Sequence, residues 1–153
     1  MITMKTKYAL KALGYLAMAP PEAPVLIAEI ADREDIPRKF LELILAELKQ
    51  HGFVRSRKGR GGGYYLAVTP QKISVAAIMR VLDGSLAPVP CLSRTAYQRC
   101  EGCRDEATCG VRLVLQEMYE ASVKLLESTT LADYVERTRK AMREGPPVLR
   151  YSI

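Results

Sequence analysis

The apolar positions of the first fifty residues predict three helices. Apolar side chains recur at helical spacing between Met4 and Met18, and the prolines at positions 20, 21 and 24 end that pattern. A short apolar helix is expected over 26–31, with the polar stretch 32–35 outside it. Pro37 suits the first turn of a third helix that runs to about His51. Its core-facing stripe consists of four side chains: Leu41, Ile44, Leu45 and Leu48.

After Gly52 the spacing of apolar residues changes from that of a helix to that of short strands. Residues 53–57 and 64–68 predict two strands, and the glycine-rich, cationic stretch 58–63 predicts the turn of a β-hairpin between them. Ser74 is typical of a helix N-cap, so a fourth helix is expected from there through Leu82, with Gly84 at its end.

The second half of the chain combines an irregular segment with a long helix. Residues 85–108 contain two prolines and three of the four cysteines. A helix is expected from about Val111 to Glu127, and a capping box of Thr130 and Asp133 opens a last helix to about Met142. The tail 145–153 is expected to be loosely attached. The long helix carries a mainly apolar stripe with further apolar positions beside it: Val111, Leu115, Met118, Ser122 and Leu125, flanked by Val114, Ala121 and Leu126.

The order of these elements predicts the fold class. Three helices followed by a hairpin within about 70 residues is the order of a winged helix-turn-helix. The chain is therefore expected to be mainly α with a small β-hairpin wing and a long C-terminal helix. Its expected divisions are a winged-helix domain over 1–84, a cysteine-rich loop over 85–109, helices over 110–144 and a tail over 145–153.

Charge is concentrated in the first half. The net charge is +6 over 153 residues; residues 1–72 hold twelve Lys/Arg and seven Asp/Glu, a net of +5, which leaves +1 for the rest. A polyanion such as nucleic acid is one partner for that half, and a solvated basic face is the alternative. No apolar run approaches the roughly 20 residues that cross a bilayer, and lysines interrupt the N-terminus. No membrane association and a cytoplasmic location are expected.

Two features of the first half fit a DNA reader. Arg38, Lys39 and Glu42 lie in the first turns of the third helix, opposite its apolar stripe, and one helix fits the major groove. The hairpin adds four cations in six positions, and four glycines there would let the backbone approach a phosphate chain or the minor groove. Alternatively, the turn itself needs those glycines. A nucleotide-binding loop is excluded, because Tyr64 stands where the last glycine of that motif belongs. The cations are Arg55, Arg57, Lys58 and Arg60.

Four cysteines fall within 19 residues, with the spacing C-x8-C-x2-C-x5-C: Cys91, Cys100, Cys103 and Cys109. Structural zinc usually shows two close pairs, and here there is one. An iron–sulfur cluster tolerates irregular spacing because the loop folds round it. A cluster, zinc or redox-active thiols therefore remain open, with the cluster favoured. A cysteine-based redox enzyme or electron carrier is the rival from another class, but the chain offers no paired acid/base groups and one histidine.

Several motifs together resemble the Rrf-two type of bacterial transcription regulators, the winged-helix family that includes IscR, NsrR, RirA and CymR. The resemblance covers about residues 1–140. It is carried by the opening Lys5–Leu10, the start of the third helix at Ile36–Glu42, the glycine-rich Gly59–Leu66, the helix opening Ile73–Val75, and the cysteine loop before a long helix.

The resemblance implies a homodimer paired through the helix Val111 to Glu127 and bound to a palindromic operator of double-stranded DNA. It also implies that Arg38, Lys39, Phe40 and Glu42 contact bases and that Lys58 enters the minor groove. The chain is then expected to be a regulator, not an enzyme, whose DNA affinity responds to redox state, nitric oxide or iron through its cluster.

The resemblance further implies that Cys91, Cys103 and Cys109 bind an iron–sulfur cluster, 2Fe–2S or 4Fe–4S. The family's usual fourth ligand is missing: Arg112 stands where one branch has a histidine, and Lys7 and Tyr8 stand where another has an acidic residue. Cys100 is the candidate that replaces it; alternatively, Cys100 is itself the middle one of the three ligands. The rival of the same fold is a thiol-redox or zinc-stabilised regulator without a cluster.

Overall fold

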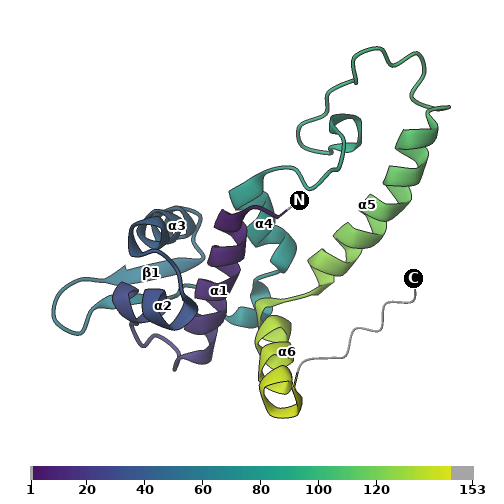
Figure 1. Cartoon of the computed structure of the whole chain (residues 1–153). Helices are drawn as coiled ribbons and strands as arrows, with labels where there is room; N and C mark the ends of the chain where they lie inside the picture. The colour runs from purple at the N-terminus through teal and green to yellow at the C-terminus, as the bar shows by residue number, and fades with distance from the viewer. Residues whose placement is uncertain (1, 146–153) are drawn as a thin grey trace.

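The computed structural model describes residues 2–145, and it confirms a mainly helical chain with one two-stranded antiparallel hairpin (Figure 1). Strand β1 pairs with β2 so that Val54 lies opposite Leu66 and Arg57 opposite Gly63. The prediction of loose attachment for 145–153 falls outside the described residues except at Gly145. The elements in chain order are α1 (Met4–Met18), α2 (Ile27–Glu34), α3 (Arg38–Gln50), β1 (Val54–Arg57), β2 (Gly63–Leu66), the 3-10 turn η1 (Pro70–Lys72), α4 (Val75–Asp83), the 3-10 turn η2 (Pro90–Leu92), α5 (Gly110–Ser128) and α6 (Leu131–Glu144).

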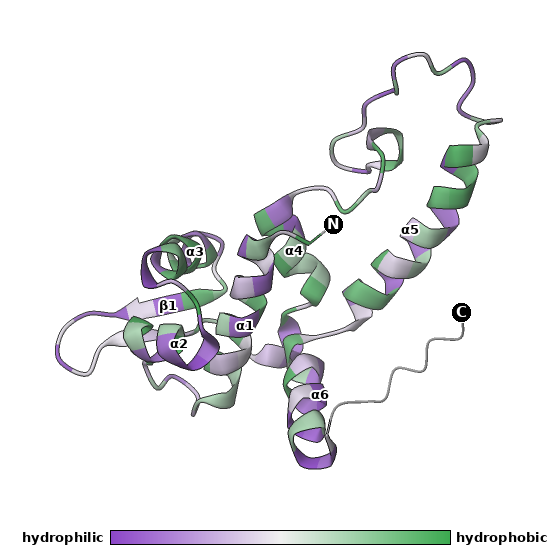
Figure 2. Ribbon diagram, in the orientation of Figure 1, coloured by the Kyte–Doolittle hydropathy of each residue, from purple (hydrophilic) through white to green (hydrophobic). Residues whose placement is uncertain are grey.

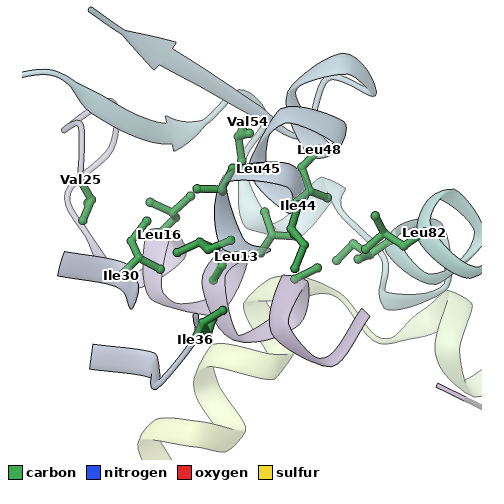
Figure 3. Packing of buried hydrophobic residues seen from close by; sticks show 14 of the residues in the cluster. Leu13, Leu16, Val25, Ile30, Ile36, Ile44, Leu45, Leu48, Val54 and Leu82 are labelled. Atoms are coloured by element: carbon green, nitrogen blue, oxygen red, sulfur yellow. The ribbon is translucent and has the colours of Figure 1, made fainter. Parts of the chain in front are cut away.

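One hydrophobic core joins the helices of the first half to the hairpin (Figure 3). Leu13 of α1 and the α3 residues Leu41, Leu45 and Leu48 have no exposed surface. Val54 at the start of β1 and Ile78 of α4 belong to the same cluster. Because the four predicted α3 positions are all buried, the opposite face of α3 is left for solvent or a ligand.

The last helix, α6, packs with the first half although it follows α5 in sequence. Leu131 at its start is fully buried in the main core, and the ring of Tyr134 lies against Gly14 of α1 so closely that a Cβ there would collide with it. The predicted capping box is present: Thr130 accepts from the Asp133 amide, and the Asp133 carboxylate accepts from the Thr130 amide. The chain therefore runs away from the main core after α4 and returns to it with α6.

The second helix is longer than its apolar pattern predicts. The polar stretch 32–35 was expected outside a helix, but α2 continues to Glu34 and ends at Asp35 in the left-handed conformation, with φ of 52°. The polar residues form the solvent face of an amphipathic turn, because Ile30, Ala31 and then Ile36 point inward. Lys11 of α1 holds this end by donating to the Glu34 carbonyl.

The cysteine loop and α5 form a separate arm of the molecule (Figure 1). Residues 84–109 run up one side of the arm and α5 returns along the other. Three buried residues, Leu92, Tyr119 and Val123, make up the core between them, with Leu115 packed alongside. Figure 2 shows apolar bands recurring along α5, where the helix stands clear of the body.

Candidate nucleic-acid interface and cysteine loop

The outer face of α3 carries the side chains that were predicted to read bases. Arg38, Lys39 and Glu42 are all exposed, and the Arg38 guanidinium pairs with the Glu42 carboxylate one turn later at 3.3 Å. This pair is open to solvent, so it contributes little to stability and separates easily. The face therefore offers two cations, one carboxylate and the hydrogen-bonding capacity of each.

Phe40 both braces α3 and keeps part of its ring exposed. Its ring meets Tyr8 of α1 edge to face, with centroids 5.8 Å apart and planes at 81°. Such aromatic pairs favour one relative orientation of the two rings. Phe40 therefore helps set how α3 projects from α1, and 37% of it remains accessible.

Polar contacts fix α3 to its neighbours at its C-terminal half. The Lys5 ammonium pairs with Glu47 of α3 at 2.9 Å and also donates to the Leu82 carbonyl at the end of α4. Lys49 donates to the Ser56 hydroxyl of β1 at 2.6 Å. α3 is thus tied to α1, α4 and the hairpin, which gives its outer face a fixed position beside the wing.

The hairpin presents its cations on one side of β1 and at its tip. Arg55, Arg57, Lys58 and Arg60 are all exposed. Arg55 and Arg57 share a face because strand residues two apart do. The Arg57 guanidinium lies 5.8 Å from the centre of the Tyr65 ring, which restrains it toward β2. Lys58 and Arg60 lie beyond the paired strands.

Two of the wing glycines have reasons internal to the fold. A Cβ on Gly63 would collide with the Val25 carbonyl, because Val25 and Tyr64 exchange two backbone hydrogen bonds of 2.8 Å. A Cβ on Gly62 would collide with the Arg57 carbonyl. These two glycines let the hairpin pack against itself and the segment before α2. Gly59 and Gly61 have positive φ and open space around them.

The cysteine loop brings Cys91 and Cys100 together. Cys91 is buried within η2, and a backbone hydrogen bond from Gln98 to Pro90 folds the chain back toward it. Cys100 is exposed; a hydrogen bond with the Cys91 thiol, partial desolvation and the nearby Cys91 and Cys103 thiols raise the pKa of its own thiol. A backbone turn joins Cys103 to Cys100.

The four thiols are not assembled around one point. Cys109 lies at the N-cap of α5, and within residues 2–145 no group of three or more His, Cys, Asp or Glu side chains is arranged to hold a metal ion. The single histidine, His51, is exposed at the C-terminal end of α3. The loop thus supplies the predicted thiol donors without the predicted convergence.

A polar cavity lies between η2 and α5, directly beside Cys91. Its volume is about 340 Å³, and Cys91, Ser93, Arg94, Arg112 and Gln116 contribute to its lining. The Arg112 Nε is buried and has no hydrogen-bond partner in this part of the structure. A buried N–H donor without an acceptor is costly, so an anionic or sulfur-rich group next to Cys91 would complete it. The sequence had marked this position only by resemblance, because Arg112 stands where one branch of the family has a histidine ligand.

The outer face of α5 carries an uncovered apolar stripe. Exposed residues repeat there at intervals of three and four positions, whereas Leu115 of the predicted stripe turns the other way and packs with Leu92. That spacing is the heptad pattern of helices that pair in a coiled coil. The members of the exposed stripe are Val111, Val114, Met118, Ala121 and Leu125.

The family model for Rrf2, described as an iron-dependent transcriptional regulator, matches residues 2–137. The chain therefore belongs to the Rrf2 family of transcriptional regulators, and the predicted resemblance is confirmed. Proteins of this class regulate transcription by binding DNA and are generally not enzymes.

Individual relatives agree. An Rrf2-like HTH-type transcriptional regulator of Rhodobacter capsulatus is 48% identical over 136 residues, which are 87% of this chain and 91% of that protein. The HTH-type transcriptional regulator IscR of Erwinia tasmaniensis is 31% identical over 134 residues, 88% of this chain and 78% of that protein.

Solved structures show the same winged-helix architecture. CymR, the global cysteine regulator of B. subtilis, superposes with a TM-score of 0.75 at 29% identity, over 90% of this chain and 97% of that one. IscR of T. potens superposes with a TM-score of 0.72 at 28% identity, over 92% and 90% of the two chains. Among residues 2–145, no helix has the length and apolar character needed to cross a bilayer.

Proposed function

We propose that the chain is a homodimeric regulator that binds a palindromic operator through α3 and the hairpin, and that an iron–sulfur cluster held by the cysteine loop controls its operator affinity. The observation that best supports this proposal is that α5 has two different faces. One face of α5 packs on Leu92 of the loop, and the opposite stripe is exposed with coiled-coil spacing. A single helix thus connects the loop to the surface that would pair two copies.

Base reading is assigned to the exposed face of α3. Arg38 and Lys39 are suited to the O6 and N7 acceptors of guanine, and Glu42 to the N4 donor of cytosine. The solvent-exposed Arg38–Glu42 pair exchanges its internal contact for contacts with a G·C pair. The accessible edge of Phe40 adds apolar contact beside them.

The wing supplies phosphate and minor-groove contacts. Lys58 and Arg60, which are exposed at the tip, enter the narrow groove next to the half-site in this proposal, and the exposed Arg55 and Arg57 neutralise phosphates. Each neutralised phosphate releases a condensed counterion, so this part of the affinity falls steeply with salt.

Pairing through the α5 stripe gives the dimer its two-fold axis. Burying Val114 and Met118 against the same residues of a second copy removes the apolar surface that the monomer leaves in water. A two-fold dimer presents its two α3 helices to half-sites about one helical turn of DNA apart, which is why the operator is palindromic.

The residues of the loop fit an iron–sulfur cluster in donor chemistry. Thiolates are the soft ligands that such clusters take, and the unpartnered Arg112 Nε beside Cys91 matches the negative charge of a thiolate-bound centre. Cys91, Cys103 and Cys109 would hold it, with Cys100 as the fourth ligand. When bound, it supplies a centre that oxidants, nitric oxide or iron shortage can alter or remove.

Packing and ion-pair contacts within the chain link the cysteine loop to the helices that would bind DNA. Leu92 rests on Tyr119 and Val123, so an ordered loop holds α5 in one orientation. Arg80 of α4 pairs with Glu127 near the end of α5, which links the arm to the body that carries α3. A released loop frees α5, and the separation of the two α3 helices is then no longer fixed. A coupling of about 1–3 kcal/mol changes operator affinity some 5- to 150-fold.

A thiol-redox regulator without a cluster is the second candidate, and it is favoured because Cys91 lies near enough to Cys100 to raise the pKa of the Cys100 thiol. A two-electron oxidant such as a peroxide would take two electrons and two protons from the two thiols, and the resulting disulfide would order the loop by a covalent bond. This candidate predicts colourless protein whose DNA binding responds to thiol reductants, and a zinc-stabilised loop predicts bound zinc in place of iron.

The proposal is tested on protein purified without oxygen. Iron, sulfide and zinc per chain and the visible spectrum are measured first, and sequence-specific duplexes are then selected from a random library. We expect about stoichiometric cluster, a visible absorbance, and selection of a palindrome. Cys91→Ala should lose the cluster and change operator affinity, because Cys91 anchors the loop beneath α5.

Gln98→Ala is the matched control, since it alters an exposed side chain of the same loop. It should retain cluster and affinity. Iron-free, colourless protein whose DNA binding is unchanged by Cys91→Ala would end the cluster part of the proposal. Failure to select any duplex would end the DNA part.

A further inference from the structure

One side chain of α3 neither belongs to the hydrophobic core nor takes part in the proposed base contacts. Leu43 is 68% exposed, although four of the five other apolar residues from Leu41 to Leu48 are buried. It lies one turn beyond Lys39 and one position after Glu42, on the outer face of the helix, and the exposed Ala46 follows it on that face. The outer face of α3 is therefore polar at its start and apolar in its middle.

An exposed leucine alone is common on protein surfaces, so its position decides its meaning. Here charged and polar residues enclose it: Lys39 and Glu42 before, Lys49 and Gln50 after. An apolar spot this small cannot support a stable protein interface, which needs about 800 Å² from each partner. An apolar spot of this size is suited to contact a single apolar group on a partner whose surface is otherwise polar.

The major groove of DNA displays one such apolar group, the 5-methyl of a pyrimidine. The inference rests on the proposed insertion of α3 into that groove. A helix rises about 1.5 Å per residue, so Leu43 lies about 6 Å along the axis from Lys39, roughly two base-pair steps of about 3.4 Å.

We propose that Leu43 packs against the 5-methyl group of a pyrimidine in each half-site, one or two base pairs from the position that Lys39 contacts. It thereby selects thymine. It also accepts 5-methylcytosine in preference to cytosine at that position, because the two methylated bases share the group that it touches.

The test uses the selected operator with each thymine of a half-site replaced in turn by deoxyuridine, which removes only the methyl. At one position we expect wild-type affinity to fall about fourfold when one half-site is changed, the effect of losing one buried methyl, and about 15-fold when both are changed. Leu43→Ala should bind the thymine and uracil operators equally.

Leu26→Ala is the control, because Leu26 is another exposed leucine of the same domain and lies before α2. It should keep the preference for thymine over uracil. At the same position, 5-methylcytosine should bind wild-type protein more tightly than cytosine and make no difference to Leu43→Ala.

Equal wild-type affinity for thymine and uracil at every position would overturn the inference while leaving operator binding intact. So would a Leu43→Ala variant that still discriminates. If Leu43→Ala changes no operator affinity but alters the association state, the leucine is a protein contact, which also overturns it. Absence of any duplex selection by wild-type protein would instead overturn the proposed function on which the inference rests.

Discussion

The body of the molecule and its arm differ in how much of their apolar surface they bury. The body, made of α1 to α4, the hairpin and α6, shares one core in which Leu13, Leu41 and Leu45 are fully buried. In the arm, made of residues 84–128, the hydrophobic core consists of only three buried side chains, and the apolar stripe of α5 faces outward. A region that leaves Val114 and Met118 in water depends on something else to cover them. The body can present α3 without help, whereas the arm needs a second copy and a ligand for its loop.

The largest difference is expected in stability. Leu13→Ala, in the body, should lower the free energy of unfolding by about 2–5 kcal/mol, because it leaves a cavity in a closed core. Leu92→Ala, in the arm, should cost about 2 kcal/mol or less and leave α1 to α4 folded, since its cluster is small. Urea denaturation followed by circular dichroism measures the first, and hydrogen exchange resolves the second.

Leu26→Ala provides the baseline for this comparison, because an exposed leucine should change stability by less than about 0.5 kcal/mol. If Leu13→Ala and Leu92→Ala shift the same single transition by equal amounts, body and arm form one cooperative unit and the contrast fails.

Charge on the α5 stripe should dissociate the dimer. Met118→Glu places a carboxylate without a partner at the centre of the proposed interface, and an uncompensated buried charge costs about 3 kcal/mol. The dimer dissociation constant, measured by sedimentation equilibrium, should rise roughly a hundredfold. Lys124→Glu alters an exposed charge of the same helix off the stripe and should leave association nearly unchanged. Persistence of a tight Met118→Glu dimer would place the interface elsewhere.

The wing should contribute charge more than sequence reading. Arg60→Ala should weaken operator binding about tenfold and reduce the steepness of its salt dependence by about 0.9, the value for one phosphate contact. Binding to random duplex should weaken in parallel. Lys72→Ala, which removes an exposed cation of η1 in the same half of the chain, is the control. An unchanged salt slope for Arg60→Ala would mean that the wing tip stays off the DNA.

The smallest effect concerns the hydrogen bonds that join Thr3, just before α1, to Asp83 at the end of α4. Burial works to raise the pKa of Asp83, but hydrogen bonds from the Thr3 amide and hydroxyl lower it, so the pKa of that carboxyl is lowered on folding. The stabilisation is therefore complete above the unfolded pKa and is lost as pH falls through the folded pKa. Asp83→Asn should cost about 1 kcal/mol near neutral pH and flatten the loss of stability below about pH 5. Asp32→Asn, at an exposed position, should behave like wild type; equal pH profiles for both variants would rule out this role.

Local signals in the sequence located most of the fold. The caps at Ser74 and Thr130 gave the starts of α4 and α6, because each side chain satisfies a backbone amide within three residues. Local sequence patterns predicted the structure less well where contacts between distant residues determine it. The end of α2 depends on which face Ile30 and Ile36 bury, and the tight approach of Gly63 to Val25 involves residues far apart in sequence.

The candidate site was predictable in residue type and less so in arrangement. The exposed face of α3 follows from helical periodicity, since burying Leu41, Ile44 and Leu48 puts Lys39 on the opposite side. The position of Cys109 at the α5 N-cap and the unpartnered Arg112 Nε beside Cys91 depend on how an irregular loop folds. No spacing rule describes such a loop.

Operator affinity of one anaerobic sample, measured before and after removal of its iron by a chelator, tests the link between arm and body most directly. The sample is kept at concentrations where sedimentation shows a dimer in both states. Operator affinity should change some 5- to 150-fold, with binding to random duplex nearly constant. Equal operator affinity of the loaded and the stripped dimer would contradict the link between arm and body.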